Sequence, residues 1–153
     1  MFDRIAGSRG RVAGPFTVLL HAPALADRVQ HVGAYLRYET ELERDVAETA
    51  VLATSRAWRS AFEWEAHEPH ARSAGVPDAV IDALRADADL AALPERYRVT
   101  AEYVRALAST GRVPDEIYGA TQTLLGTKAL VELTVLVGYY TMLAMTLGGH
   151  EID

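Results

Sequence analysis

Cysteine is missing from this sequence of 153 residues. Its absence excludes disulfides, thiolate metal sites, thiol nucleophiles and dithiol redox chemistry on this chain. Positive charge is also scarce, since 15 lysines and arginines stand against 21 aspartates and glutamates and the formal net charge is −6. Binding to nucleic acid phosphates needs clustered lysine and arginine, whereas the arginines here are scattered among acids. The sequence therefore predicts no nucleic-acid partner.

Long apolar runs are equally rare. The first residues, MFDRIAGSRGRVAGPF, carry charges and lack the apolar stretch of a signal peptide, so we expect a cytoplasmic protein. One run near the carboxyl terminus, ALVELTVLVGYYTMLAMTLGG, is about long enough to span a membrane. Glu132 and several Thr and Gly residues dilute it and no basic flank follows, which favours a buried helix and no membrane contact. In so small a chain, a second subunit is the expected cover for such a helix.

The residues that are present indicate one helical domain. Half of them are hydrophobic and 24% are charged, which is typical of a globular protein. Strand-like alternation is not sustained anywhere, and glycine and proline stand where helices would stop. We predict an all-α, single-domain bundle of six to seven helices over residues 16–153, preceded by a flexible arm over residues 1–15. The expected helices cover about residues 23–38, 42–57, 60–74, 77–84, 95–110, 114–126 and 128 onward.

Residues 48–75, ETAVLATSRAWRSAFEWEAHEPHARSAG, contain the side chains best suited to chemistry. On a helix with about 100° per residue, one stripe collects Ser60, Glu63, Trp64 and His67. Glu63 and His67 are four residues apart, so their side chains can touch. A carboxylate beside an imidazole fixes the tautomer and favours the charged form, and both effects suit a general acid or base. Glu48 can join them only if the chain reverses near residues 58–60.

Ordinary structural roles also account for part of this stretch. Ser60 with Glu63 three residues later fits a capping box at the start of a helix. His67 and His70, with acids nearby, could be read as a metal site. Zinc and iron usually take three protein ligands of fixed geometry, and two histidines three residues apart are a weak signal. We therefore predict no metal.

The spacing of these residues resembles the carboxymuconolactone decarboxylase family, which includes the alkyl-hydroperoxidase-like proteins. The family pattern reads here as Glu48, Ser60, FEW at residues 62–64, His67, Ala71 and Gly75, followed by VPDAVIDAL. The closing LVELTVLVGYYTMLA also resembles the last helix of the family, so the match spans about residues 15–150. The resemblance implies the alkyl-hydroperoxidase-like helical fold, assembled as homotrimers or homohexamers with pockets near subunit contacts.

Family members that reduce peroxides use two cysteines one turn apart, which would stand at Ser60 and Glu63. Because neither is cysteine, and serine and glutamate cannot cycle through a disulfide, we expect no thiol peroxidase activity. The sequence instead resembles the decarboxylase branch, which relies on a carboxylate and a histidine without metal or organic cofactor. This resemblance implies that Glu48 and His67 are the catalytic pair.

The resulting hypothesis is a cofactor-independent carboxy-lyase acting on a small carboxylated lactone or keto acid. His67 would protonate the enolate-type anion left by loss of carbon dioxide, with Glu48 or Glu63 orienting the imidazole. Residues assigned to substrate contact are Ser60, Trp64, Arg56, Trp58 and Tyr140, with Arg59 as a second candidate for a carboxylate clamp. Two alternatives stay open, because a fold does not determine a reaction. The scaffold could perform isomerisation, dehydration or hydrolysis, or it could be a catalytically silent oligomeric binding protein.

Overall fold

The chain forms seven α-helices over residues 13–152, the range that this computed structural model describes, and no strand occurs in that range. In chain order the helices are α2 (Pro15–Leu19), α3 (Pro23–Tyr38), α4 (Arg44–Ala57), α5 (Ala61–Ser73), α6 (Asp78–Ala86), α7 (Glu95–Thr110) and α8 (Asp115–Gly149). The prediction of an all-α fold with six to seven helices is confirmed. Residues 1–12 of the predicted arm lie outside the described residues, and Pro15 is already the first residue of α2.

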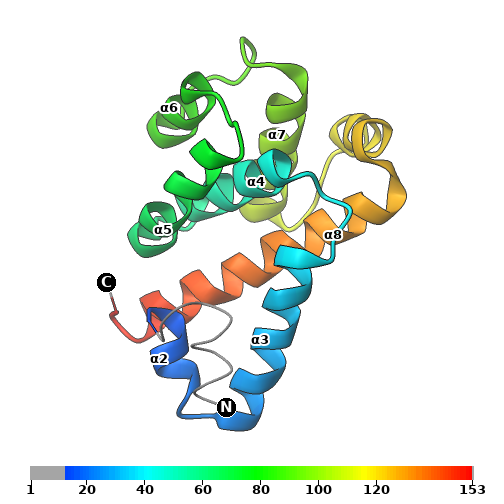
Figure 1. The fold of residues 1–153 in the computed structure, drawn as a ribbon. Coiled ribbons are helices and arrows are strands. Elements are labelled where there is room, and N and C mark those ends of the chain that lie inside the picture. Colours follow the sequence, from blue (N-terminus) through cyan, green and yellow to red (C-terminus); the bar gives the residue numbers. More distant parts are fainter. Residues whose placement is uncertain (1–12, 153) are drawn as a thin grey trace.

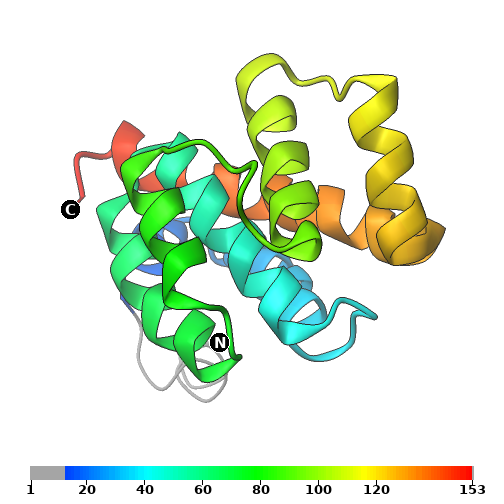
Figure 2. The ribbon, with the colours of Figure 1, turned by 90° about the horizontal axis from the view of Figure 1, so that it is seen from above.

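Helix α8 crosses the middle of the molecule (Figure 1). Helices α4 to α7 lie on one side of it, and α2 and α3 lie on the other. The view from above shows α4 between the α5–α6 pair and α7 (Figure 2), and α4 packs against α5, α6, α7 and α8. The site described below therefore lies where α4, α5 and α8 meet.

The middle of helix α4 is buried on all sides. Its ten consecutive residues 46–55 are all buried, and alanines among them allow close approach of neighbouring helices. Three of its buried polar side chains donate hydrogen bonds to carbonyl groups one turn earlier: Thr49 to Asp45 at 2.7 Å, Thr54 to Ala50 at 2.7 Å and Ser55 to Val51 at 2.8 Å. These bonds satisfy hydroxyl groups that would otherwise be costly to bury. The one acid in this interior segment is Glu48.

Glycine and proline mark several helix ends as the sequence indicates. Helix α3 begins at Pro23, whose fixed φ suits a first helical position, and α7 is followed by Gly111 at φ 70°. The expected break before residue 128 lies inside α8 at Gly126, where φ is 79° and ψ is 167°. A residue with a side chain rarely adopts this conformation, so the two helical segments of α8 meet at the one residue type that permits it.

The carboxyl-terminal part of α8 supplies much of the core. Within the described range, α8 is the one helix long and apolar enough to cross a membrane, but 56% of its most apolar window is buried inside the chain. Leu133, Leu136 and Leu143 are among its core residues. This burial is what a core helix of a globular protein shows.

Glu132 has a structural role in α8 besides lowering the hydrophobicity of this segment. It is buried, and its two carboxylate oxygens accept hydrogen bonds from the Tyr35 hydroxyl at 2.7 Å and the Glu41 backbone N–H at 2.8 Å. These bonds satisfy a carboxyl group that would otherwise be costly to bury. They hold the end of α3 and the connection to α4 against α8, and the candidate site described next opens beside this junction.

Candidate active site

The chain reverses between α4 and α5, as the Glu48–His67 contact requires. Trp58 follows the last residue of α4, and Arg59 has a φ of 52°, an uncommon value for a residue with a side chain. The Ser60 hydroxyl then accepts the Glu63 backbone N–H at 3.5 Å and caps the start of α5. Helix α5 consequently runs back along α4, and residues nineteen apart in the sequence become neighbours.

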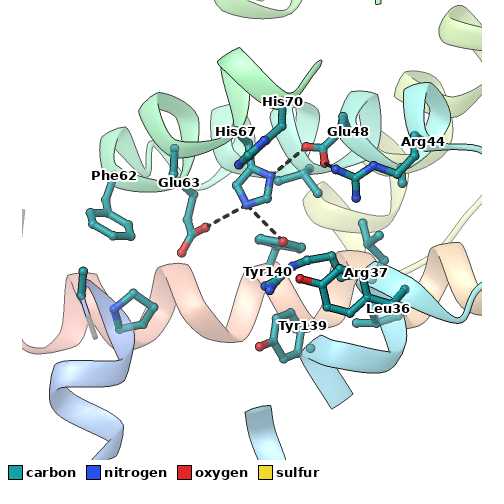
Figure 3. Close-up of a pocket in the computed structure, with 18 residues that line it drawn as sticks. Leu36, Arg37, Arg44, Glu48, Phe62, Glu63, His67, His70, Tyr139 and Tyr140 are labelled. Atoms are coloured by element: carbon teal, nitrogen blue, oxygen red, sulfur yellow. Dashed lines mark hydrogen bonds and ion pairs between the residues drawn. The ribbon is translucent and has the colours of Figure 1, made fainter. Parts of the chain in front are cut away.

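Glu48 and His67 form a direct hydrogen bond across the two helices. The Nδ1 atom of His67 lies 2.8 Å from Oε2 of Glu48, and both side chains are largely buried. Figure 3 marks this contact with a dashed line. The other carboxylate oxygen of Glu48 lies 3.1 Å from the Arg44 guanidinium. Because the carboxylate accepts from a guanidinium on one oxygen, we assign the acceptor role to its other oxygen as well, and the hydrogen between Glu48 and His67 then belongs to Nδ1. Glu48 thus fixes both the tautomer and the orientation of the ring.

The second nitrogen of His67 faces two further groups. Its Nε2 atom lies 3.1 Å from the Tyr140 hydroxyl oxygen and 3.9 Å from Oε2 of Glu63. Dashed lines mark both contacts in Figure 3. The rings of His67 and Tyr140 meet edge to face, with centroids 5.0 Å apart. Glu48 is therefore the hydrogen-bonded partner of the imidazole, and Glu63 is a second carboxylate just beyond hydrogen-bond distance.

The Tyr140 hydroxyl is strongly held in its neutral form. Burial raises the pKa of Tyr140 well above the usual value for tyrosine, and the negative charges of Glu63 and Glu48 raise it further. The positive charge of Arg37 acts in the opposite direction without cancelling these effects. At neutral pH Tyr140 is therefore a hydrogen-bond donor next to His67.

These groups line one cavity of about 600 Å³. Its polar wall includes Glu48, Glu63, His67, Tyr140, Arg37 and Arg44, and its apolar wall includes Pro15, Leu36, Val51, Phe62 and Leu136. Such a volume holds a small organic molecule, and a few converging polar groups on an otherwise apolar surface are typical of a ligand site. A small acid entering here would meet carboxylates, guanidinium groups and an imidazole together.

Trp58 and Ser60, two of the predicted substrate contacts, lie outside the lining of this cavity. Trp58 stands at the end of α4 with 40% of its surface exposed. The Ser60 hydroxyl caps α5, which is the structural role that the sequence indicated for it. Both residues belong to the reversal between the helices, which brings the catalytic candidates together without itself lining the cavity. Exposed Arg59, the second candidate for a carboxylate clamp, is part of the same turn.

Trp64 and Arg56 also lie outside the cavity lining, because both face α6. The Trp64 indole N–H donates to Glu68 at 2.9 Å, and the Arg85 guanidinium lies 5.0 Å from the centre of its ring. Hydrogen bonds from Arg72 and then Arg85 lower the pKa of Glu68 to about 2, so this acceptor stays ionised. Arg56 donates from Nε to the Arg85 carbonyl at 3.0 Å. Of the five predicted substrate contacts, the structure places Tyr140 in the cavity.

Several lining residues were absent from the sequence-based set. Arg37 and Tyr139 come from α3 and α8, and nothing in their local sequence marks them. Arg44 did offer a signal, because it precedes Glu48 by four residues and so lies on the same helix face. His70 lines the cavity beside His67, with ring centroids 5.7 Å apart. Among residues 13–152, no three His, Asp or Glu side chains are grouped so as to hold a metal ion.

Comparison with known proteins supports the fold. No family model matches the sequence, and no curated protein matches it. Among solved structures, the chain is similar to the crystal structure of a protein of unknown function from Agrobacterium tumefaciens, provisionally described as the antioxidant defence protein AhpD. The TM-score is 0.74 at 17% sequence identity, over 92% of this chain and 97% of that chain. The fold is therefore alkyl-hydroperoxidase-like, whereas an identity this low leaves the reaction open.

Proposed function

We propose that this protein is a cofactor-independent enzyme that transfers protons through Glu48 and His67, and that it decarboxylates a small carboxylated lactone or keto acid. The observation that carries the proposal is the 2.8 Å hydrogen bond between these two side chains at the wall of a 600 Å³ cavity. A buried acid that orients an imidazole beside a ligand-sized space is an arrangement suited to general acid–base catalysis. An ion pair on the outer surface would have no such use.

Different walls of the cavity suit different parts of a carboxylated substrate. Arg37 and Arg44 on its wall suit a carboxylate, since a guanidinium donates two parallel hydrogen bonds to such a group. Loss of carbon dioxide leaves the bonding electron pair on the substrate as an enolate-type anion. The Glu48–His67 pair then supplies the proton that this anion takes up. The apolar wall near Phe62 and Leu136 would hold the remaining carbon skeleton.

Thiol peroxidase activity forms no part of this function. The sequence contains no cysteine. At the two positions where the family resemblance would place the peroxidase cysteines, the chain has a helix-capping serine, Ser60, and a buried carboxylate, Glu63. Neither side chain can form the disulfide on which such a cycle depends. We therefore propose no cysteine-based antioxidant role for this protein.

The proposed reaction is tested by measuring carbon dioxide release from a panel of carboxylated lactones and β-keto acids. The purified protein, with no added metal or organic cofactor, is expected to accelerate release from at least one acid above the rate in buffer. The heat-denatured protein is the control for spontaneous decarboxylation. If every acid in the panel decarboxylates at its buffer rate, the carboxy-lyase proposal is wrong.

A second candidate is another proton-transfer reaction in the same cavity, such as isomerisation, dehydration or hydrolysis. Glu63 favours it, because a second buried carboxylate 3.9 Å from Nε2 of His67 suits a base that removes a proton. Exchange of substrate hydrogen for deuterium without carbon dioxide release would identify this candidate. A catalytically silent binding protein is less well supported, since binding alone does not require Glu48, His67 and Tyr140 to converge.

We also propose that the protein assembles into a homotrimer or homohexamer. Apolar side chains remain exposed along α3 and α8, among them Leu25, Val32, Val131, Val135 and Met145. Between the two helices lies a second, largely apolar hollow of about 400 Å³. A contact between copies would remove this surface from water. Light scattering at micromolar concentration is expected to give the mass of three or six chains, and the mass of one chain would contradict the proposal.

A further inference from the structure

The hydrogen bonds around His67 place a proton on Tyr140. Glu48 accepts from Nδ1, so the Nε2 atom of a neutral imidazole carries a lone pair and accepts from the Tyr140 hydroxyl 3.1 Å away. In this state the acidic hydrogen nearest the cavity is that of the tyrosine. When the imidazole is protonated, Nε2 instead donates to the same oxygen, and the hydroxyl hydrogen is free to turn toward a ligand.

The surroundings of Tyr140 suit it to passing a proton on rather than losing one. Its ring is buried, and its hydroxyl contacts His67 of α5. The charged groups that act on it electrostatically from the same cavity are Glu63 of α5, Glu48 of α4 and Arg37 of α3. Burial and the two carboxylates raise the pKa of Tyr140, which makes a lasting tyrosinate unfavourable. The hydroxyl can therefore give up its proton only as it receives another. His67 is the neighbour placed to supply it.

We infer that Tyr140 is the catalytic acid that hands the proton to the substrate, and that His67 resupplies Tyr140. This inference rests on the proposed function and assigns its last step to a residue of α8. Side chains from three helices then form one series of hydrogen bonds. Glu48 on α4 orients His67 on α5, and His67 bonds to Tyr140 on α8. The substrate carbon that loses carbon dioxide lies against the Tyr140 hydroxyl.

The proposed step is a concerted transfer of two protons. The bond between the substrate carbon and its carboxylate breaks, carbon dioxide leaves, and the electron pair stays on the carbon skeleton. The Tyr140 O–H bond breaks as its proton joins that carbon, while the proton on Nε2 of protonated His67 moves to the tyrosine oxygen. Tyr140 ends neutral, His67 ends neutral with its Nδ1–H still donated to Glu48, and one proton from water restores the imidazolium.

The test is the substitution Tyr140→Phe, which removes the hydroxyl and keeps the ring that packs on His67. With the panel acid that the wild type converts fastest, kcat is expected to fall about 100-fold or more, within the range for loss of a general acid. KM is expected to change little, because the apolar ring still walls the cavity. The matched control is Tyr103→Phe, which removes another buried hydroxyl, bonded to Thr134 at 2.7 Å outside the cavity lining. It is expected to retain wild-type kcat.

A stereochemical measurement separates proton delivery from simple loss of packing. In deuterium oxide, with an acid whose product carbon is prochiral, the wild type is expected to place deuterium on one face. Residual product from Tyr140→Phe is expected to carry deuterium on both faces, because water then protonates the anion. Retention of wild-type kcat and one-sided labelling in Tyr140→Phe would overturn the role of Tyr140. If His67→Gln is inactive in the same assay, the proposed function stands without it; if the wild type converts no acid, both fall.

Discussion

Replacement of His67 by glutamine is expected to reduce carbon dioxide release to the rate seen in buffer. The imidazole joins Glu48, at 2.8 Å, to Tyr140, at 3.1 Å, at the wall of the cavity. A glutamine amide neither gains nor loses a proton near neutral pH, so it cannot restore the proton that a turnover consumes. Loss of a general acid or base lowers rates by about 10²–10⁴-fold, and the resupply of Tyr140 is lost as well.

The same substitution is expected to leave the fold intact. The glutamine amide can still donate a hydrogen bond to the Glu48 carboxylate, which also keeps its 3.1 Å contact with Arg44. Thermal unfolding of His67→Gln, followed by circular dichroism, is expected to stay close to that of the wild type. The control is His31→Gln on the exposed face of α3, which is expected to change neither activity nor stability. A fully active His67→Gln protein would remove His67 from the mechanism.

Replacement of Glu48 by glutamine is expected to give the second large effect, a fall in kcat of about 10²-fold. Glutamine has nearly the shape of glutamate, but its amide can either donate or accept, so it no longer holds the hydrogen on Nδ1. It also carries no charge, so it cannot balance the positive charge that the imidazole ring gains in the proposed cycle. Both changes act on the imidazole and leave the cavity walls in place. The expected signature is therefore a loss in kcat with KM nearly unchanged.

A matched control distinguishes this role from the loss of an ordinary ion pair. Glu102 pairs with Arg98 within α7 at 3.0 Å, with the same four-residue spacing as Glu48 and Arg44, but it lies away from the cavity lining. Glu102→Gln is expected to change stability by no more than about 1 kcal/mol and to leave kcat unaltered. Steady-state kinetics on all three proteins makes the comparison. Equal rates for Glu48→Gln and Glu102→Gln would show that Glu48 is a structural residue.

Local signals in the sequence are sufficient for most of the helices and for the reversal that brings Glu48 to His67. Pro23 and Gly111 mark helix ends because one fixes φ and the other tolerates a positive φ. Ser60 marks the start of α5 because a hydroxyl accepts a free backbone N–H there. Helix α2, with five residues, was missed because so short a segment shows no helical periodicity.

The direction in which each side chain points could not be predicted so well. Trp64 and His67 share one stripe of α5, yet His67 turns to α4 and α8 while Trp64 turns to Arg85 of α6. A stripe of about a third of the helix surface can face two neighbours, and their positions depend on packing between distant segments. The same reason hides Arg37, which reaches the cavity only because α3 lies beside α8. Periodicity identifies a face of a helix but not its partner.

Nitrogen NMR of the histidine side chains tests the Glu48–His67 contact most directly, because it needs no substrate. In protein labelled with ¹⁵N at histidine, near neutral pH, His67 is expected to show a protonated Nδ1 whose hydrogen exchanges slowly with water. That signal is expected to disappear in Glu48→Gln, while the signals of His21 and His150 stay unchanged. A His67 ring that exchanges tautomers freely and does not respond to Glu48→Gln would show that Glu48 does not hold the imidazole.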